Sequence, residues 1–321
     1  MRDLRAIALF TALIALVPLL THSGVVLNFV MMSLYACLLA QAWNILGGYG
    51  GQFSFGHSLF FGTGAYVQAM AQVHAGLNPW LTLILAVMSG AAVGCFIGSV
   101  SFRYGLKGSY FALITLAFAE VFRIIALSVP FTGAGVGLML PLKESAANMQ
   151  FTDKAGYVWL MLGLVTIALL ATTWLCQSRF GAYLQAVRDN EDAARAIGVD
   201  PFKVKLWATI LSGGLMAAGG AFYVQVFHYI DPGLAFGPAT SVEALVGAIV
   251  GGMGTLWGPL LGAVVLSILG DVTRNMFGQL PGINMVIYGC VLILIMLFLP
   301  RGISGLGESC RKLFGSKKDS S

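Results

Sequence analysis

The fold is decided by the stretch SRFGAYLQAVRDNEDAARAIGVDPFKVK at residues 178–205. This stretch is the long, densely charged segment of the chain, and it holds five of the 18 basic residues and four of the 13 acidic residues. The sequence on both sides consists mostly of apolar runs. We therefore expect membrane-embedded segments before and after it, with one short helix between them that is exposed to water.

Residues 190–198 carry the start and stop signals of a helix of about two turns. Asn190 can accept hydrogen bonds from the free backbone N–H groups of the first turn. Gly198 suits the left-handed residue that ends a helix. Such a short helix is not stable alone in water, so it needs a surface to pack against. Its candidate contact residues are Asn190, Glu191, Asp192, Ala193, Ala194, Arg195 and Gly198.

The composition identifies the class of protein. Hydrophobic residues make up 58% of the chain and charged residues 10%, with a mean hydropathy of +0.86, whereas a soluble domain carries about 25% charged residues. This favours an all-α, polytopic integral membrane protein in contact with the lipid bilayer. The net charge of +5 comes from basic residues at positions set by membrane topology, so we expect no nucleic-acid partner. The five cysteines have no C-x-x-C spacing, and we expect neither a disulfide framework nor a metal site.

Apolar runs predict about 8–10 transmembrane helices, because about 20 helical residues cross the hydrocarbon core. The runs 240–253 and 257–271 are short and interrupted by glycine. They form either two tight spans or one re-entrant hairpin. The full set of apolar runs is 6–21, 26–46, 58–73, 80–101, 108–128, 157–176, 206–228, 240–253, 257–271 and 284–299.

Basic residues predict the orientation, since Lys and Arg favour the cytoplasmic side. With a cytoplasmic N-terminus, 14 of the 18 basic residues fall inside, provided that the number of crossings is even. We therefore expect both termini in the cytoplasm. The predicted organisation is a membrane domain at 1–300, with 178–205 as a cytoplasmic loop, and a basic cytoplasmic tail at 301–321.

Two stretches are rich in glycine, NILGGYGGQFSFGHSLFFGTGAY at 44–66 and VGAIVGGMGTLWGPLLGA at 246–263. Non-helical backbone at membrane depth is tolerated only where it is buried in protein or lines a wet cavity. The glycines therefore serve either close helix packing alone or packing together with a translocation path between two related halves. The candidate path residues are Gly47, Gly48, Gln52, Ser54, His57, Gly251 and Gly252.

Charged residues within apolar runs need a reason. Glu120 and Arg123 are three residues apart and can form an ion pair on one helix face. This pair is either structural or a contact to a zwitterionic substrate or partner subunit. Glu243 is expected in the first turn of its helix, and His57 is expected to be a hydrogen-bonded packing residue.

The chain contains no G-x-x-x-x-G-K-[ST] phosphate loop and no H-E-x-x-H zinc helix. We therefore expect no ATP hydrolysis by the chain itself and no catalytic residues.

Three stretches together resemble the LivM-type permease subunits of branched-chain amino acid ABC importers: 44–66, RFGAYLQAVRDNEDAARAIGVDPFKVKLWA at 179–208, and MGTLWGPLLGA at 253–263. The resemblance extends from about residue 25 to about residue 300. Permeases of ABC importers carry a cytoplasmic E-A-A-x-x-x-G loop that docks on the ATPase. Asp192-Ala193-Ala194 and Gly198 are similar to this pattern, with Asp in place of Glu and without its I-x-L-P continuation.

The resemblance implies a permease in the bacterial inner membrane that works with a homologous second permease and two ATPase subunits. It also implies a periplasmic or extracellular substrate-binding protein. ATP would be bound by the partner subunits, so no cofactor is expected in this chain. Related permeases carry urea or short amides, which leaves the substrate open. A stand-alone secondary transporter or channel is the alternative from another functional class.

Overall fold

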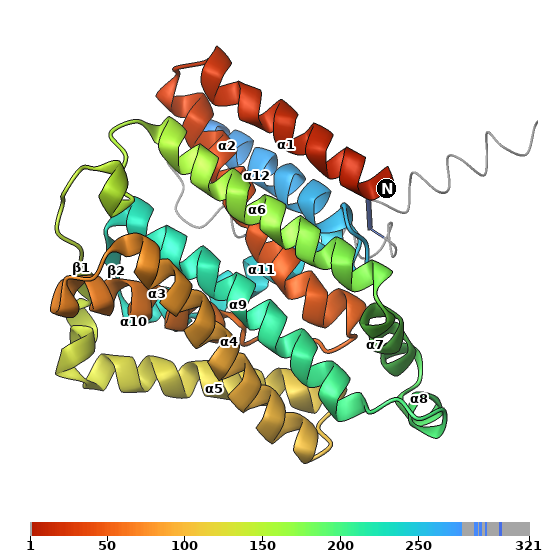
Figure 1. Ribbon diagram of the computed structural model, residues 1–321. Coiled ribbons are helices and arrows are strands. Elements are labelled where there is room, and N and C mark those ends of the chain that lie inside the picture. Colours follow the sequence, from red (N-terminus) through yellow and green to blue (C-terminus); the bar gives the residue numbers. More distant parts are fainter. Residues whose placement is uncertain (1, 278–285, 288, 291–292, 294–301, 304–321) are drawn as a thin grey trace, which may run out of the picture.

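The computed structural model describes residues 2–277, together with 286–287, 289–290, 293 and 302–303. Most of the described chain is helical (Figure 1), with a single two-stranded pairing between β1 and β2. The helices up to the charged stretch are α1 (Arg2–Leu20), α2 (Gly24–Asn44), η1 (Ile45–Tyr49), α3 (His57–Ala75), α4 (Pro79–Arg103), α5 (Gly108–Ser128), η2 (Pro130–Thr132), η3 (Ala134–Val136), η4 (Ala146–Asn148) and α6 (Lys154–Gln177). The later helices are α7 (Arg179–Asp189), α8 (Glu191–Ala196), α9 (Pro201–Phe227), α10 (Pro232–Phe236), α11 (Pro238–Gly251) and α12 (Gly258–Phe277).

The prediction of an all-α polytopic membrane protein is confirmed. In the described part, seven helical segments are long and apolar enough to cross a membrane. α3 and α12 run alongside them as further helices of 19 and 20 residues. The predicted run at 284–299 and the predicted tail at 301–321 lie outside the described residues, apart from the few positions given above.

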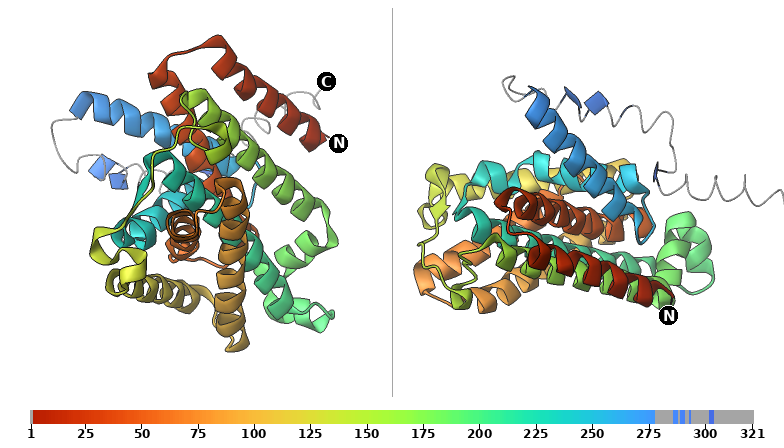
Figure 2. Two further views of the ribbon diagram at one scale, coloured as in Figure 1. Left: turned by 60° about the vertical axis from the view of Figure 1, so that its left-hand side comes forward. Right: turned by 90° about the horizontal axis from the view of Figure 1, so that it is seen from above.

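The bundle has two distinct ends, which the views in Figures 1 and 2 separate. At one end, β1 (Leu138–Met139) pairs antiparallel with β2 (Tyr229–Ile230). We call this the β end. At the opposite end lie α7 and α8, with the N-terminus of α1 and the loop between α4 and α5. We call this the α7–α8 end.

α9 is the central helix of the bundle, and it packs closely because several of its contacts are made through glycine. A Cβ on Gly90 in α4 would lie 2.6 Å from the carbonyl oxygen of Gly213 in α9, and a Cβ on Gly213 would lie 2.7 Å from the carbonyl oxygen of Gly90. Small residues let membrane helices approach backbone to backbone, where dispersion forces act over many atoms. α9 thereby connects the α7–α8 end rigidly to the membrane helices.

The prediction of glycine-broken segments is confirmed in both stretches. After α2, the chain forms the π-helical turn η1 and then runs without regular structure through residues 50–56 before α3 begins. The second break is at residues 252–257, between α11 and α12. α10 and α11 lead from the β end to this break, and α12 leads back (Figure 1). The pair therefore forms two antiparallel helical segments, α11 and α12.

The charged stretch 178–205 differs from the prediction of a single short helix. It contains α7 and α8 and the first residues of α9. α7 buries Gly181, Leu184 and Val187, which share one face at helical spacing. Ser178 caps this helix by accepting a hydrogen bond from the backbone N–H of Gly181 at 3.2 Å. The cap and the apolar spacing were both readable from the sequence.

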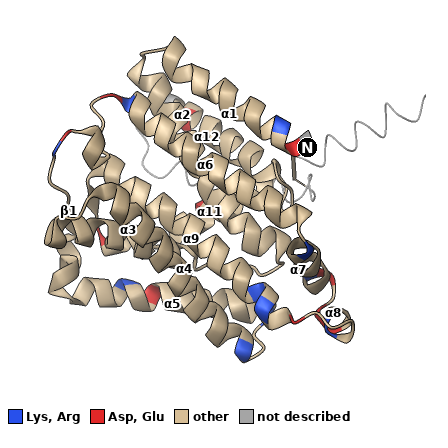
Figure 3. Ribbon diagram, viewed as in Figure 1, with Lys and Arg blue, Asp and Glu red and all other residues tan. Residues whose placement is uncertain are grey.

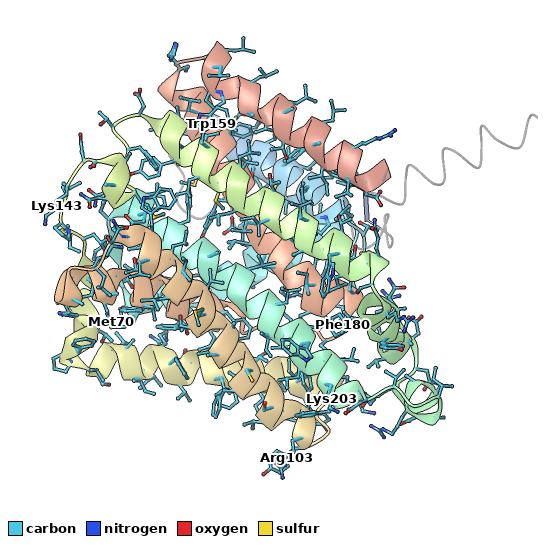
Figure 4. The ribbon with its side chains drawn as sticks, in the orientation of Figure 1. Met70, Arg103, Lys143, Trp159, Phe180 and Lys203 are labelled. Carbon is cyan, nitrogen blue, oxygen red and sulfur yellow. The ribbon has the colours of Figure 1, made fainter. Side chains whose placement is uncertain are left out.

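Basic residues are concentrated at the α7–α8 end of the bundle (Figure 3). They lie at the end of α4, on α7 and α8, and at the start of α9. Figure 4 places Arg103 and Lys203 at this end, whereas Lys143 lies in the loop at the β end. The two ends therefore differ strongly in charge.

Candidate functional site

The local structure of α8 confirms its predicted caps. The side-chain oxygen of Asn190 accepts hydrogen bonds from the backbone N–H groups of Asp192 and Ala193, at 3.1 and 3.0 Å. Gly198 has a φ of +88°, in the left-handed region that other residues enter only with strain. These two residues fix where the short helix begins and ends.

α8 has one buried face and one exposed face. Ala194 is buried in an apolar cluster with Leu184 of α7 and Val204 of α9. This cluster supplies the packing surface that so short a helix needs. On the other face, Ile197 is 77% exposed, next to the exposed residues Asp192, Ala193, Arg195 and Gly198.

Glu191 belongs to the buried side of α8. Its carboxylate accepts a hydrogen bond from Lys205 of α9 at 2.5 Å and forms ion pairs with Lys107 and Arg195 at 3.3 Å each. Burial favours the neutral carboxyl, but the hydrogen bonds and charges of Lys205 and Lys107 outweigh it and hold the pKa of Glu191 below its ordinary value. Glu191 therefore ties α8 to α9 and to the α4–α5 loop.

Arg188 connects α7 to both glycine breaks. Its Nη1 donates a hydrogen bond to the backbone carbonyl oxygen of Gly48 in η1 at 3.1 Å. A Cβ added at Gly254 would lie 3.2 Å from this same nitrogen. One end of a charged surface helix is thus bonded directly to the broken backbone of the membrane domain.

Asn44 holds the two glycine breaks together. Its Nδ2 donates to the carbonyl oxygen of Thr255 at 2.9 Å, and its Oδ1 accepts from the backbone N–H of Gly254 at 2.7 Å. Asn44 itself is fully buried, whereas Gly254 is half-buried and Thr255 is exposed, so both bonds are partly buried. The two stretches singled out in the sequence therefore meet in space at the α7–α8 end.

The candidate path glycines lie at close backbone contacts. A Cβ on Gly47 would overlap the indole of Trp43. A Cβ on Gly48 would lie 2.5 Å from the backbone nitrogen of Gly254. Gly251 approaches the backbone of Gly258 in the same manner, and Gly252 ends α11 with a φ of +116°. The close-packing interpretation is confirmed for these glycines, and their part in a path stays a prediction.

The polar candidates of the first stretch are buried and bonded. His57 Nε2 forms a hydrogen bond with Ser212 of α9 at 2.9 Å, as expected of a packing residue. Ser54 Oγ lies 3.2 Å from the hydroxyl of Thr115, and Gln52 donates to the Gly50 carbonyl at 3.3 Å. These bonds pair some of the polar groups in and next to the irregular segment 50–56, whereas Gln52 Oε1 and His57 Nδ1 have no hydrogen-bond partner among the described residues.

A cavity of about 360 Å³ lies among α2, α9, α11 and α12. Its polar lining includes the side chains of Glu243 and Asp271, with Tyr35 of α2 nearby. Glu243 is the sixth residue of α11, so the prediction that it occupies the first helical turn is wrong. The error arose because the turn at Gly237-Pro238 starts α11 earlier than the apolar run does.

The predicted ion pair on α5 is confirmed. Arg123 donates from Nε and Nη2 to the two carboxylate oxygens of Glu120, at 2.8 and 2.5 Å. Their side chains are 31% and 49% exposed, respectively. In the described part of the chain the pair therefore faces outward from the bundle. Charged side chains in membrane spans usually face protein or water.

Several residues at this site were not predicted from the sequence as site residues: Lys107, Arg188, Ile197, Lys205 and Gly254. Only Ile197 carried a usable signal, as an apolar residue next to the cap of a charged helix. The others act through partners far away in the sequence.

The chain matches the model of the branched-chain amino acid transport system / permease component family over residues 25–296. The chain belongs to this family. It is therefore a multi-pass membrane permease of a transport system, and the resemblance to LivM-type permeases is confirmed.

The permease has several curated relatives. It is 26% identical to the LivM permease protein of Escherichia coli over 311 residues, which cover 89% of this chain and 71% of the relative. It is 25% identical to the LivH permease protein of E. coli over 297 residues, covering 86% and 92% of the two chains. Both relatives are named high-affinity branched-chain amino acid permeases. The fructose import permease FruF of Bifidobacterium longum is 26% identical over 208 residues, covering 63% and 57%. No solved structure matches the permease.

Proposed function

We propose that the permease is the membrane-spanning subunit of an ATP-driven importer for branched-chain or chemically related amino acids. The observation that carries this proposal is the double attachment of the charged helices at the α7–α8 end. α8 is bonded to α9 through Glu191 and Lys205, and α7 is bonded to η1 through Arg188 and Gly48. This arrangement can transmit a displacement of the surface helices to the glycine-broken membrane segments.

The exposed face of α8 is the proposed docking site for an ATPase subunit. It presents Ile197 with Asp192, Ala193, Arg195 and Gly198. The remaining candidates serve differently, since Asn190 caps the helix while Glu191 and Ala194 fasten it to the permease. Two ATPase subunits would bind and hydrolyse ATP, because the permease contains no phosphate loop.

The concentration of basic residues at the α7–α8 end (Figure 3) supports an orientation with this end in the cytoplasm of a bacterial inner membrane. The β end would then face the periplasm or cell exterior, where a substrate-binding protein delivers the amino acid. In this orientation the N-terminus of α1 lies on the cytoplasmic side, together with the docking helix.

A homologous second permease is the proposed partner within the membrane. The Glu120–Arg123 pair on the outward face of α5 supports this proposal. In lipid, such a pair would be exposed to hydrocarbon, whereas a neighbouring subunit could cover it. The two permeases would enclose a path, and ATP-driven closure of the ATPases would change its access from one side to the other.

The transport cycle follows from the rigid connections. Displacement of α8 moves Lys205 and the start of α9, because Asp200 caps α9 directly after the α8 turn. Displacement of α7 moves the Gly48 carbonyl and, through Asn44, the loop at 252–257. The breaks allow these segments to shift without bending a continuous helix.

Uptake into membrane vesicles tests the proposed function. Vesicles containing the permease with its second permease, ATPases and binding protein are expected to accumulate leucine only with ATP. Urea, a short amide and fructose serve as alternative substrates, the last because FruF is named for it. Accumulation of one of these in place of leucine would contradict the amino-acid assignment. Flux through the permease alone would instead favour a secondary transporter or channel.

A further inference from the structure

A separate pocket of about 330 Å³ lies at the α7–α8 end. It is enclosed by the end of α4, the α4–α5 loop, α8 and the start of α9. The pocket borders the exposed docking face of α8, since Arg195 belongs to both, but most of its lining lies on the side where Glu191 and Lys205 meet.

The lining of this pocket is strongly basic. It contains four basic side chains, Arg103, Lys107, Arg195 and Lys205, and one acidic side chain, Glu191. Glu191 is bonded to three of these cations, whereas Arg103 forms no ion pair with any residue that the structure describes. Arg195 also pairs with Asp192 at 3.7 Å. Two carboxylates therefore face four cations, and this excess of positive charge favours an anion in the pocket.

Exposed aromatic residues near the pocket indicate its depth relative to a bilayer. Tyr104 at the end of α4, Tyr110 at the start of α5 and Trp207 in α9 are 78%, 75% and 60% exposed. Tyr and Trp side chains with such exposure in membrane proteins concentrate at the level of the lipid headgroups. Because these three residues neighbour the pocket in sequence, its basic side chains lie at headgroup depth.

We propose that this pocket binds the phosphate group of an anionic membrane lipid. The guanidinium of Arg103 is available for a bidentate contact to phosphate oxygens, and Lys107 and Arg195 add positive charge from two other elements. Basic pockets between membrane helices on the cytoplasmic side suit anionic headgroups. The site goes beyond the transport function proposed above and does not depend on the identity of the substrate.

A bound headgroup would add a connection between elements that Glu191 already links. Arg103 belongs to α4, Lys107 to the α4–α5 loop and Arg195 to α8. The lipid phosphate attracts all three and lowers the repulsion among them. The bound phosphate therefore holds α8, the docking helix, against α4 and α9. Anionic lipid thereby restricts the movement of α8.

The test uses the full-length permease in a neutral detergent, with binding of phosphatidylglycerol followed by native mass spectrometry and titration. We expect saturable binding of phosphatidylglycerol and little binding of phosphatidylcholine. The double variant Arg103→Gln/Lys107→Gln is expected to bind about 30-fold more weakly, since each basic residue at a membrane surface contributes about a factor of five. Because Lys107 also pairs with Glu191, the single variant Arg103→Gln is measured as well and is expected to lose about fivefold.

The matched control is Arg179→Gln/Lys203→Gln, which removes two exposed basic residues at the same end but outside the pocket. It should bind phosphatidylglycerol as the unaltered permease does. Equal losses in the control and pocket variants would overturn the proposal in favour of diffuse charge attraction. Displacement of the lipid by millimolar inorganic phosphate would overturn the lipid assignment and identify the ligand of the pocket as a free anion. If the pocket variants lost ATPase co-purification but kept their lipid affinity, the pocket would be a contact to the ATPase and the proposal would be overturned.

Discussion

Arg188 and Gly48 are separated by 140 residues in the sequence, yet the guanidinium of one donates a hydrogen bond to the backbone carbonyl of the other at 3.1 Å. This bond joins a charged surface helix to a π-helical turn in the membrane domain. Irregular backbone in a membrane protein leaves carbonyl groups without helical partners, and a buried group of this kind is costly unless it is bonded. Arg188 satisfies such a carbonyl and at the same time couples two elements mechanically.

Removing this bond tests the coupling. Arg188→Gln is expected to lower ATP-dependent uptake strongly while ATPase co-purification persists, because the docking face of α8 is unchanged. The loss of a charged hydrogen bond corresponds to about 1.5–3 kcal/mol of stability between α7 and η1. The matched control is Arg179→Gln, at the other end of α7. If Arg188→Gln took up as much substrate as Arg179→Gln, the coupling role of Arg188 would be contradicted.

Docking on α8 is expected to depend on Ile197. Replacing this exposed apolar side chain by glutamate should weaken ATPase co-purification by about 30-fold or more, as expected when a central interface residue worth about 2 kcal/mol is lost. Leu142→Glu introduces the same charge at an exposed apolar residue near the β end and controls for insertion. Retention of the ATPase by Ile197→Glu would exclude this face as the docking site. Ala194→Arg is a weaker test, because the buried Ala194 packs α8 against the permease.

The stability of α8 is expected to depend on pH through Glu191. Its pKa is lower in the folded permease than in the unfolded chain, so its stabilising contribution is present above the unfolded value and is lost as the pH falls through the folded value. The difference in thermal unfolding midpoint between the permease and Glu191→Gln should therefore be largest near neutral pH and shrink below about pH 4.5. A difference that is constant down to about pH 3 would contradict the ionic role of Glu191.

The contact between the two glycine breaks predicts a position-specific effect of alanine. Gly48→Ala places a methyl group against the Gly254 backbone nitrogen, and overpacking of this kind costs about 1–3 kcal/mol. Gly163 in α6 has no neighbour within 4 Å of an added Cβ, so Gly163→Ala should be neutral or stabilising. Resistance to unfolding in sodium dodecyl sulfate measures both variants. Equal effects at the two positions would show that the close approach of the breaks is unimportant.

The ion pair on α5 predicts a characteristic mutant cycle. Glu120→Gln or Arg123→Gln alone leaves one unpaired charge on an apolar helix, whereas the double variant leaves none. Each single variant should reduce co-purification of the second permease more than the double variant does, because an unpaired charge in a membrane interface costs about 2.5–3.5 kcal/mol. If all three variants assembled normally with the second permease, the proposal that α5 lies in the interface would be wrong.

Local features of this protein could be predicted from neighbouring residues. Asn190 and Gly198 act within one or two turns of the backbone, and the structure confirms both the cap and the left-handed end. The Glu120–Arg123 pair is equally local, since three residues bring side chains to one helix face. α7 was missed although Ser178 and the apolar spacing signalled it, because its charged residues led to its interpretation as a loop.

By itself, the sequence determined the membrane class, the caps of the short helix α8 and the two glycine-rich breaks, since composition and caps act locally. Only the tertiary structure decided that these breaks meet through Asn44 and Gly254, and that Arg188 reaches Gly48. It also decided that Glu191 faces inward to Lys205 while Ile197 faces outward. Such contacts depend on how distant helices pack, and a single sequence specifies that packing only through the sum of many weak, non-local interactions.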